Sequence, residues 1–153
     1  MNPEARGFRL YRSEPSVSQP EMVKLLTLSE TQCLELLRTE AVGRVGLSVN
    51  ALPVILPVNY VMVDRTIVFA SESGLKLDAA RRTTVACFQI DGHGTWAHEG
   101  WSVLATGRLN EIEAERSATL ARELPLTPWA IATPRHYVEL SIELLSGRRL
   151  IGC

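Results

Sequence analysis

The 153-residue sequence is short of the features that staple a fold, anchor it in a membrane or prepare it for nucleic acid. Its three cysteines, at positions 33, 87 and 153, form no C-x-x-C pair, so neither a disulfide framework nor a zinc site is predicted. No apolar run approaches the ~18–20 residues that cross a bilayer, and no secretory-signal pattern opens the chain. Its net charge is −1, without any block of five like charges. We therefore expect a cytoplasmic protein that binds neither nucleic acid nor membrane.

Catalytic and metal-binding signatures are also missing. The chain has no G-x-S-x-G, no Walker loop, no H-E-x-x-H and no dinucleotide fingerprint. His93 and His98 share a loop, but no third ligand follows at a useful spacing, so no metal is predicted. Any chemistry in this chain must therefore rest on a less obvious arrangement.

The length fits one domain, which we place at residues 27–153. Residues 1–26 hold three prolines, three serines and mixed charges without periodicity, which predicts a flexible N-terminal arm. Ser29 followed by Gln32 predicts a capping box, and the helix that it starts should stop near Gly43.

The remaining pattern is β-rich. Alternating or β-branched runs predict strands at 44–49, 53–63, 66–70, 83–90, 101–110 and 137–145, a glycine-rich loop at 91–94, and helices at 75–82 and 111–124. Pro53 and Pro57 cannot donate to a ladder, so their strand should lie at an edge, or be bent or bulged. Six strands with short helices predict a mainly β fold, a closed or partly closed antiparallel barrel.

A small polar cluster follows the third strand. Ser71, Ser73 and Lys76 combine hydroxyl donors with one ammonium at the start of a short helix, which is typical of an anion site and suits a phosphate. A capped surface helix with a solvated lysine explains the same spacing equally well.

The segment Trp101–Ala105 is apolar at nearly consecutive positions, so both faces of its strand should be covered. One face packs on the barrel core. The other could be covered by a second subunit, by a planar ligand, or by the chain's own 111–124 helix.

Five short motifs occur in a telling order: G-R-V-G-L (43–47), P-V-N-Y (57–60), F-A-S-x-x-G-x-K (69–76), V-A-C-F (85–88) and W-S-V-x-x-x-G (101–107). Together they resemble the pyridoxamine 5′-phosphate oxidase-like flavoproteins, closest to the branch of nitroimidazole-resistance and flavin-nucleotide-binding proteins. The resemblance covers residues 28–112 well. It implies a six-stranded antiparallel split β-barrel that dimerises, with two FMN molecules in clefts between the subunits.

The resemblance also assigns roles to residues. It implies that main-chain groups of Pro57, Val58, Asn59 and Tyr60 line the isoalloxazine ring. It implies that Ser71 and Lys76 hold the phosphate and that Trp101 and Ser102 lie beside the flavin. Trp129 and Arg149 would then reach the flavin of the partner.

The chain departs from true pyridoxamine 5′-phosphate oxidases at its end. Residues 146–153 lack the R-L-H-D-R-type segment that grips the substrate phosphate, so oxidation of pyridoxamine phosphate is not expected. Our hypothesis is an FMN-dependent oxidoreductase that acts on a small substrate, with no catalytic acid or base assigned. The alternatives left open are a non-catalytic flavin-binding or sensing protein, a deazaflavin-dependent reductase, and a barrel that only mediates protein contacts. Haem lacks an identifiable axial ligand.

Overall fold

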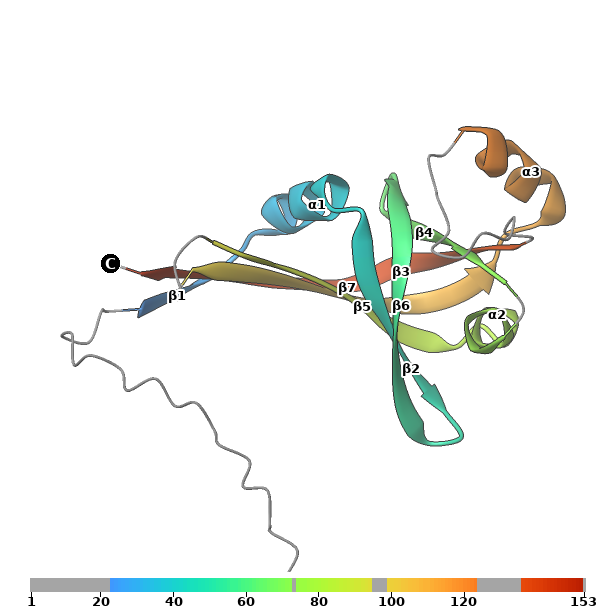
Figure 1. The fold of residues 1–153 in the computed structure, drawn as a ribbon, viewed down its shortest axis with the longest axis horizontal. Helices are drawn as coiled ribbons and strands as arrows, with labels where there is room; N and C mark the ends of the chain where they lie inside the picture. The colour runs from blue at the N-terminus through green and yellow to red at the C-terminus, as the bar shows by residue number, and fades with distance from the viewer. Residues whose placement is uncertain (1–22, 73, 95–98, 124–135, 153) are drawn as a thin grey trace, which may run out of the picture.

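The computed structural model describes residues 23–72, 74–94, 99–123 and 136–152, and its chain is mainly strand (Figure 1). The elements in chain order are β1 Val23–Thr27, α1 Glu30–Thr39, β2 Val42–Val49, β3 Leu52–Val63, β4 Thr66–Ser71, α2 Leu75–Arg81, β5 Val85–His93, β6 Gly100–Glu111, α3 Ala114–Glu123 and β7 His136–Gly152. No helix in these ranges is long and apolar enough to cross a membrane.

Six of the strands close a barrel. The antiparallel order is β7-β4-β3-β2-β5-β6, and β6 pairs back onto β7. This confirms the six-stranded antiparallel barrel. A seventh strand, β1, pairs with the end of β7 outside the ring, through Val23↔Gly152 to Thr27↔Arg148. The sequence pattern missed β1 and placed residues 23–26 in the arm, whose residues 1–22 lie outside the described ranges.

The strands β5, β6 and β7 run beyond the barrel, where the sequence predicted a loop at 91–94 and a strand end at 145 (Figure 1). Gly92 pairs with Trp101, and a Cβ on Gly92 would meet the indole ring at 2.6 Å. The glycine therefore allows a tryptophan to pack across the strand, and the prediction of a loop there was wrong.

The helix α1 begins as predicted and ends earlier. Ser29 and Gln32 form the capping box, with Ser29 N donating to Gln32 Oε1 at 2.8 Å. The helix ends at Thr39, and Gly43 lies inside β2 instead of stopping a helix. A Cβ on Gly43 would overlap the Phe88 ring, so this glycine serves close packing between strands.

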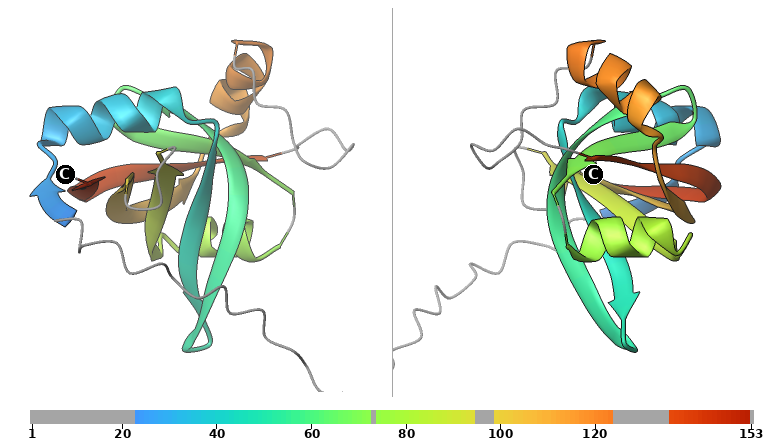
Figure 2. Two further views of the ribbon diagram at one scale, coloured as in Figure 1. Left: turned by 60° about the vertical axis from the view of Figure 1, so that its left-hand side comes forward. Right: turned by 90° about the vertical axis from the view of Figure 1, so that its right-hand side faces the viewer.

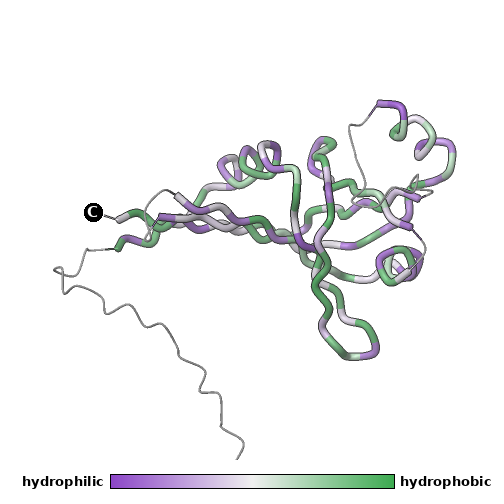
Figure 3. Tube along the Cα trace, in the orientation of Figure 1, coloured by the Kyte–Doolittle hydropathy of each residue, from purple (hydrophilic) through white to green (hydrophobic). Residues whose placement is uncertain are grey.

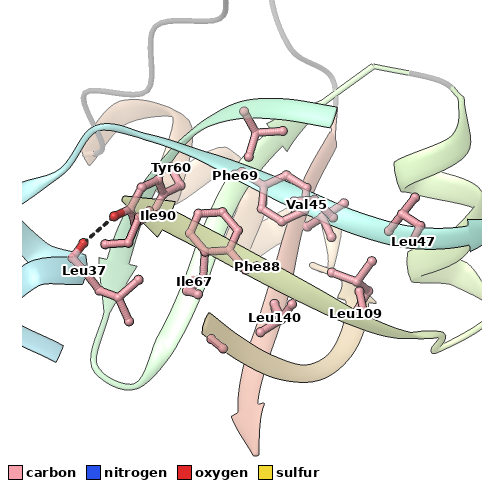
Figure 4. Packing of buried hydrophobic residues seen from close by; sticks show 14 of the residues in the cluster. Leu37, Val45, Leu47, Tyr60, Ile67, Phe69, Phe88, Ile90, Leu109 and Leu140 are labelled. Atoms are coloured by element: carbon pink, nitrogen blue, oxygen red, sulfur yellow. Dashed lines mark hydrogen bonds between the residues drawn. The ribbon is translucent and has the colours of Figure 1, made fainter. Parts of the chain in front are cut away.

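The barrel interior is filled by large apolar side chains from every strand of the ring and from α1 (Figure 4). Phe88 is fully buried at its centre, edge-on to Tyr60 with ring centroids 4.7 Å apart. The Tyr60 hydroxyl donates to the Leu37 carbonyl at 2.8 Å, which joins α1 to β3. A second, smaller cluster of Val68, Ile112, Leu120 and Tyr137 holds α3 against β4 and β7.

Candidate functional site

The wall of the barrel opens between β3 and β4. Only Tyr60–Val63 of β3 pair with β4, whereas residues 52–59 pair with β2 alone. On the other side, Ala70 and Ser71 of β4 pair with β7 alone. We call the gap between these two stretches the split. Figure 2 shows the β2–β3 hairpin, which includes the β3 side of the split, projecting away from the barrel.

The prolines of β3 face the split. Val63 and Thr66 pair on either side of the two-residue turn between β3 and β4. In an antiparallel ladder, the N–H and C=O groups of successive residues point alternately toward one neighbouring strand and the other. Tyr60 N donates to Ala41 O, on the β2 side, so the odd-numbered residues of β3 direct their backbone groups toward the split. Pro53 and Pro57 are therefore at positions where no ladder donor is needed. Of the predicted edge, bend or bulge, the edge holds for residues 52–59, which have β2 as their only partner strand, whereas Tyr60–Val63 also pair with β4. The β2–β3 register has no bulge.

The residues predicted to hold a flavin ring and its phosphate lie on the two sides of the split. Tyr60↔Phe69 is the last pair between β3 and β4. If that register continued for two more residues, Val58 would lie opposite Ser71. Val58 and Tyr60 bury their side chains in the core, so this stretch of β3 offers mainly its backbone, together with half-buried Asn59. That arrangement fits the main-chain role that the resemblance implies for Pro57–Tyr60.

The other side of the split carries Ser71 at the end of β4, and Lys76 follows in the first turn of α2. Ser71 is 3% exposed, and its hydroxyl donates to the Glu72 carbonyl at 2.9 Å. Lys76 is half-buried on α2. Loss of water lowers the pKa of Lys76, and the Glu72 carboxylate acts in the opposite direction. A partly desolvated ammonium attracts an anion more strongly than a fully hydrated one. Ser73 lies outside the described residues.

Trp101 and Ser102 do not join this group within one chain. Along β7, Ser71 pairs with His136 at one end and Trp101 pairs with Arg149 near the other. The strand between His136 and Arg149 is about 40 Å long at ~3.3 Å per residue. Figure 1 likewise shows α2 and the C-terminal end of β7 on opposite sides of the molecule. Arg149, which the resemblance implies reaches the partner's flavin, is the register partner of Trp101, and Trp129, given the same role, lies outside the described residues.

The outer face of the barrel carries an exposed row of low polarity. The register aligns Ile55, Gly46, Cys87, Thr106 and Leu144 across five strands. Ile55 and Leu144 are each 70% exposed at the two ends, and Leu104 is exposed in the next row. The helix α3 packs on β4 and β7 instead, so of the three covers left open for β6 the 111–124 helix is excluded. Figure 3 shows that stretches of hydrophobic residues run along the β2–β3 hairpin.

Two charged groups of residues were not found from the sequence. Arg81 of α2 donates from Nε to Glu111 Oε2 of β6 at 2.6 Å, and His136 Nδ1 lies 2.9 Å from Glu111 Oε1. On the outer face, Arg44 Nη1 donates to Asp91 Oδ1 at 2.7 Å, and Gln89 Nε2 donates to the same oxygen at 3.0 Å. Apart from Gln89 and Asp91, which are two positions apart on β5, the partners in each group are at least 25 positions apart, and one sequence carries no local signal for such contacts.

The described residues hold no group of three His, Cys, Asp or Glu side chains arranged to bind a metal. The His93 side chain is 84% exposed and lies 3.6 Å from Asp91, while His98 is outside the described ranges.

Comparisons with known proteins agree with this architecture. The profile of the pyridoxamine 5′-phosphate oxidase family matches residues 29–149. An FAD-binding protein from Mesorhizobium loti superposes with a TM-score of 0.72 and 25% identity, over 85% of this chain and 99% of that chain. An FAD-binding protein from Mycobacterium smegmatis gives a TM-score of 0.63 and 28% identity, over 82% and 98%. A candidate 5-nitroimidazole antibiotic resistance protein from Bacteroides thetaiotaomicron shares the fold, with a TM-score of 0.67 and 13% identity over 85% and 90%. The resemblance indicated by the sequence motifs is confirmed.

Proposed function

The chain belongs to the pyridoxamine 5′-phosphate oxidase family, and from that premise we propose that it binds FMN at the split between β3 and β4. The observation that carries the proposal is the geometry of the split. A backbone edge freed from its neighbouring strand faces the end of β4, where Ser71 and half-buried Lys76 follow one another. The two FAD-binding proteins of similar fold support a flavin as the ligand.

The residues of the split fit such a ligand. The ring edge of a flavin carries both donors and acceptors, and the exposed edge of β3 offers the carbonyls of Pro53 and Pro57 and both backbone groups of Ile55. Lys76 would supply the charge for the phosphate, and Ser71 could donate to it after its hydroxyl turns away from the Glu72 carbonyl. A bound flavin would supply hydride transfer, while the protein positions the ring and excludes water. We propose on this basis an oxidoreductase acting on a small substrate.

A homodimer is the second part of the proposal. Trp101 and Ser102 lie too far from Ser71 to contact the same flavin within one chain, but a two-fold partner could bring its own copies to the split. The exposed row from Ile55 to Leu144 supports this arrangement, because an isologous dimer needs a self-complementary apolar face.

Lys76 provides the direct test of flavin binding. We expect Lys76→Ala to weaken FMN binding by about tenfold, the size of one charge-assisted hydrogen bond, and to leave binding of riboflavin nearly unchanged. Fluorescence titrations with FMN, FAD, a deazaflavin and riboflavin measure this, with Lys24→Ala, at the only other lysine, as the matched control.

The proposal fails if the purified protein binds none of these flavins. If the protein binds the deazaflavin or FAD more tightly than FMN, that flavin is the cofactor instead of FMN. If FMN binds but no turnover follows with NAD(P)H and common acceptors, the protein is a non-catalytic flavin binder.

A further inference from the structure

His136 lies beside the predicted phosphate-binding residues, although no sequence motif includes it. It opens β7 and is the register partner of Ser71, the last residue of β4. Val138 and Phe69, two residues further along each strand, are paired and fully buried in the barrel core. Because side chains alternate along a strand, His136 and Ser71 share this inward side. Cross-strand partners have Cβ atoms about 5 Å apart, so the two side chains are direct neighbours.

The orientation of the imidazole is fixed by its hydrogen bond to Glu111. The Arg81 guanidinium, and then His136, hold the pKa of the Glu111 carboxyl below its usual value, so this group is a carboxylate that accepts. Nδ1 of His136, 2.9 Å from Glu111 Oε1, must therefore be the donor. The other nitrogen, Nε2, is then the atom that accepts a hydrogen bond in the neutral ring and donates one in the protonated ring.

Charged groups of α2 and Glu111 determine how protonation of His136 affects a bound anion. Glu111 is paired with Arg81, which also feels Asp78, and Lys76 feels Glu72. Protonation of His136 adds a positive charge beside the Glu111–Arg81 pair and places a donor next to Ser71. A phosphate is therefore repelled less and held better when His136 is protonated.

We propose that His136 is a third ligand of the flavin phosphate, beside Ser71 and Lys76, and that it holds the phosphate only in its protonated form. The inference rests on the proposed function, and adds to it a pH dependence that acts on the phosphate and not on the ring. Binding of FMN should then strengthen as the pH falls, whereas binding of riboflavin, which has the same ring without a phosphate, should not.

The experiment compares FMN with riboflavin at pH 8 and pH 6 in the wild type, in His136→Gln and in His93→Gln. His93 is a matched control because its side chain is largely exposed and because it is the last residue of β5, a strand that does not contain His136. We expect the ratio of FMN to riboflavin affinity to be about tenfold more favourable at the lower pH in the wild type and in His93→Gln. In His136→Gln this gain should be lost. FMN's own phosphate takes up a proton near pH 6, but this effect is common to all three proteins.

An equal change of the ratio in His136→Gln and in the wild type overturns the inference and leaves the proposed function standing. Failure of both FMN and riboflavin to bind at either pH overturns the proposed function itself. If His136→Gln does not fold, an NMR titration of the wild-type His136 ring gives the answer. FMN should shift the midpoint of that titration upward and riboflavin should not, and equal midpoints with the two ligands overturn the inference.

Discussion

Gly43 shows how one missing side chain sets the spacing of the barrel strands. A Cβ at this position would overlap the ring of Phe88, which is fully buried and held edge-on by Tyr60. The ring has no free space to move into, because protein cores are close-packed. We therefore expect Gly43→Ala to lower the free energy of unfolding by about 1–3 kcal/mol, the usual range for overpacking.

Gly46, three residues along the same strand, provides the comparison for Gly43. A Cβ there would press on the Cys87 sulfur, which belongs to a half-exposed side chain that can rotate outward. Urea unfolding of Gly43→Ala and Gly46→Ala should show the larger loss at Gly43. Equal losses would mean that the Phe88 ring is not the constraint.

At the scale of elements, α1 depends on a side chain from β3 to complete its last turn. Leu37 is among the last four residues of the helix, whose carbonyls have no partner within it. The buried Tyr60 hydroxyl donates to this carbonyl, and burial raises the pKa of Tyr60, so it remains a donor throughout the neutral range. We expect Tyr60→Phe to cost about 1–2 kcal/mol, since it leaves a buried carbonyl unpaired while keeping the ring contact with Phe88.

Two measurements check the role of Tyr60. Urea unfolding gives the loss of stability, and hydrogen exchange should show faster exchange in the last turn of α1. A normal exchange rate in α1 of Tyr60→Phe would place the effect elsewhere in the barrel.

The elements that could be predicted from sequence are those with local causes. The capping box at Ser29, the alternation in β2 and the edge position required by Pro53 and Pro57 all depend on neighbouring residues, and all were confirmed. The strand β1 and the end of β7 were missed because they depend on pairing between distant segments: β1 pairs with the end of β7, which in turn pairs with β6.

The candidate site was likewise predictable only where its residues form local motifs. The backbone edge at 57–60 and the Ser71–Lys76 cluster were visible as motifs, and the structure places Ser71 across the split from that edge. The neighbourhood of Ser71 and His136 was not visible, because residues 65 positions apart meet there only through the β4–β7 ladder. Trp101 was grouped with the site by the resemblance, but nothing in its spacing shows that it lies far from Ser71 within one chain.

At the scale of the whole molecule, the exposed row from Ile55 to Leu144 should be the contact between two copies. We expect Leu144→Arg to convert a dimer into a monomer, because a buried, unpaired charge at an apolar interface is costly. Leu52→Arg is the control: Leu52 is 67% exposed, close to the 70% of Leu144, but it alternates to the opposite side of β3 from Ile55. Analytical ultracentrifugation distinguishes the two, and a dimer that survives Leu144→Arg would exclude this face.

If the dimer brings Trp101 of one chain to the split of the other, two defective variants should repair each other. Lys76→Ala and Trp101→Ala each damage both sites of their own homodimer. In a mixed dimer, one site would combine the two defects, whereas the other would have an intact Lys76 from one chain and an intact Trp101 from its partner. Random exchange makes half of the dimers mixed, so about one site in four should bind FMN with wild-type affinity. Stoichiometric titration of the exchanged mixture measures that fraction. If Lys76 and Trp101 instead served the same flavin from a single chain, every site in the mixture would carry a defect, and no tight binding would return.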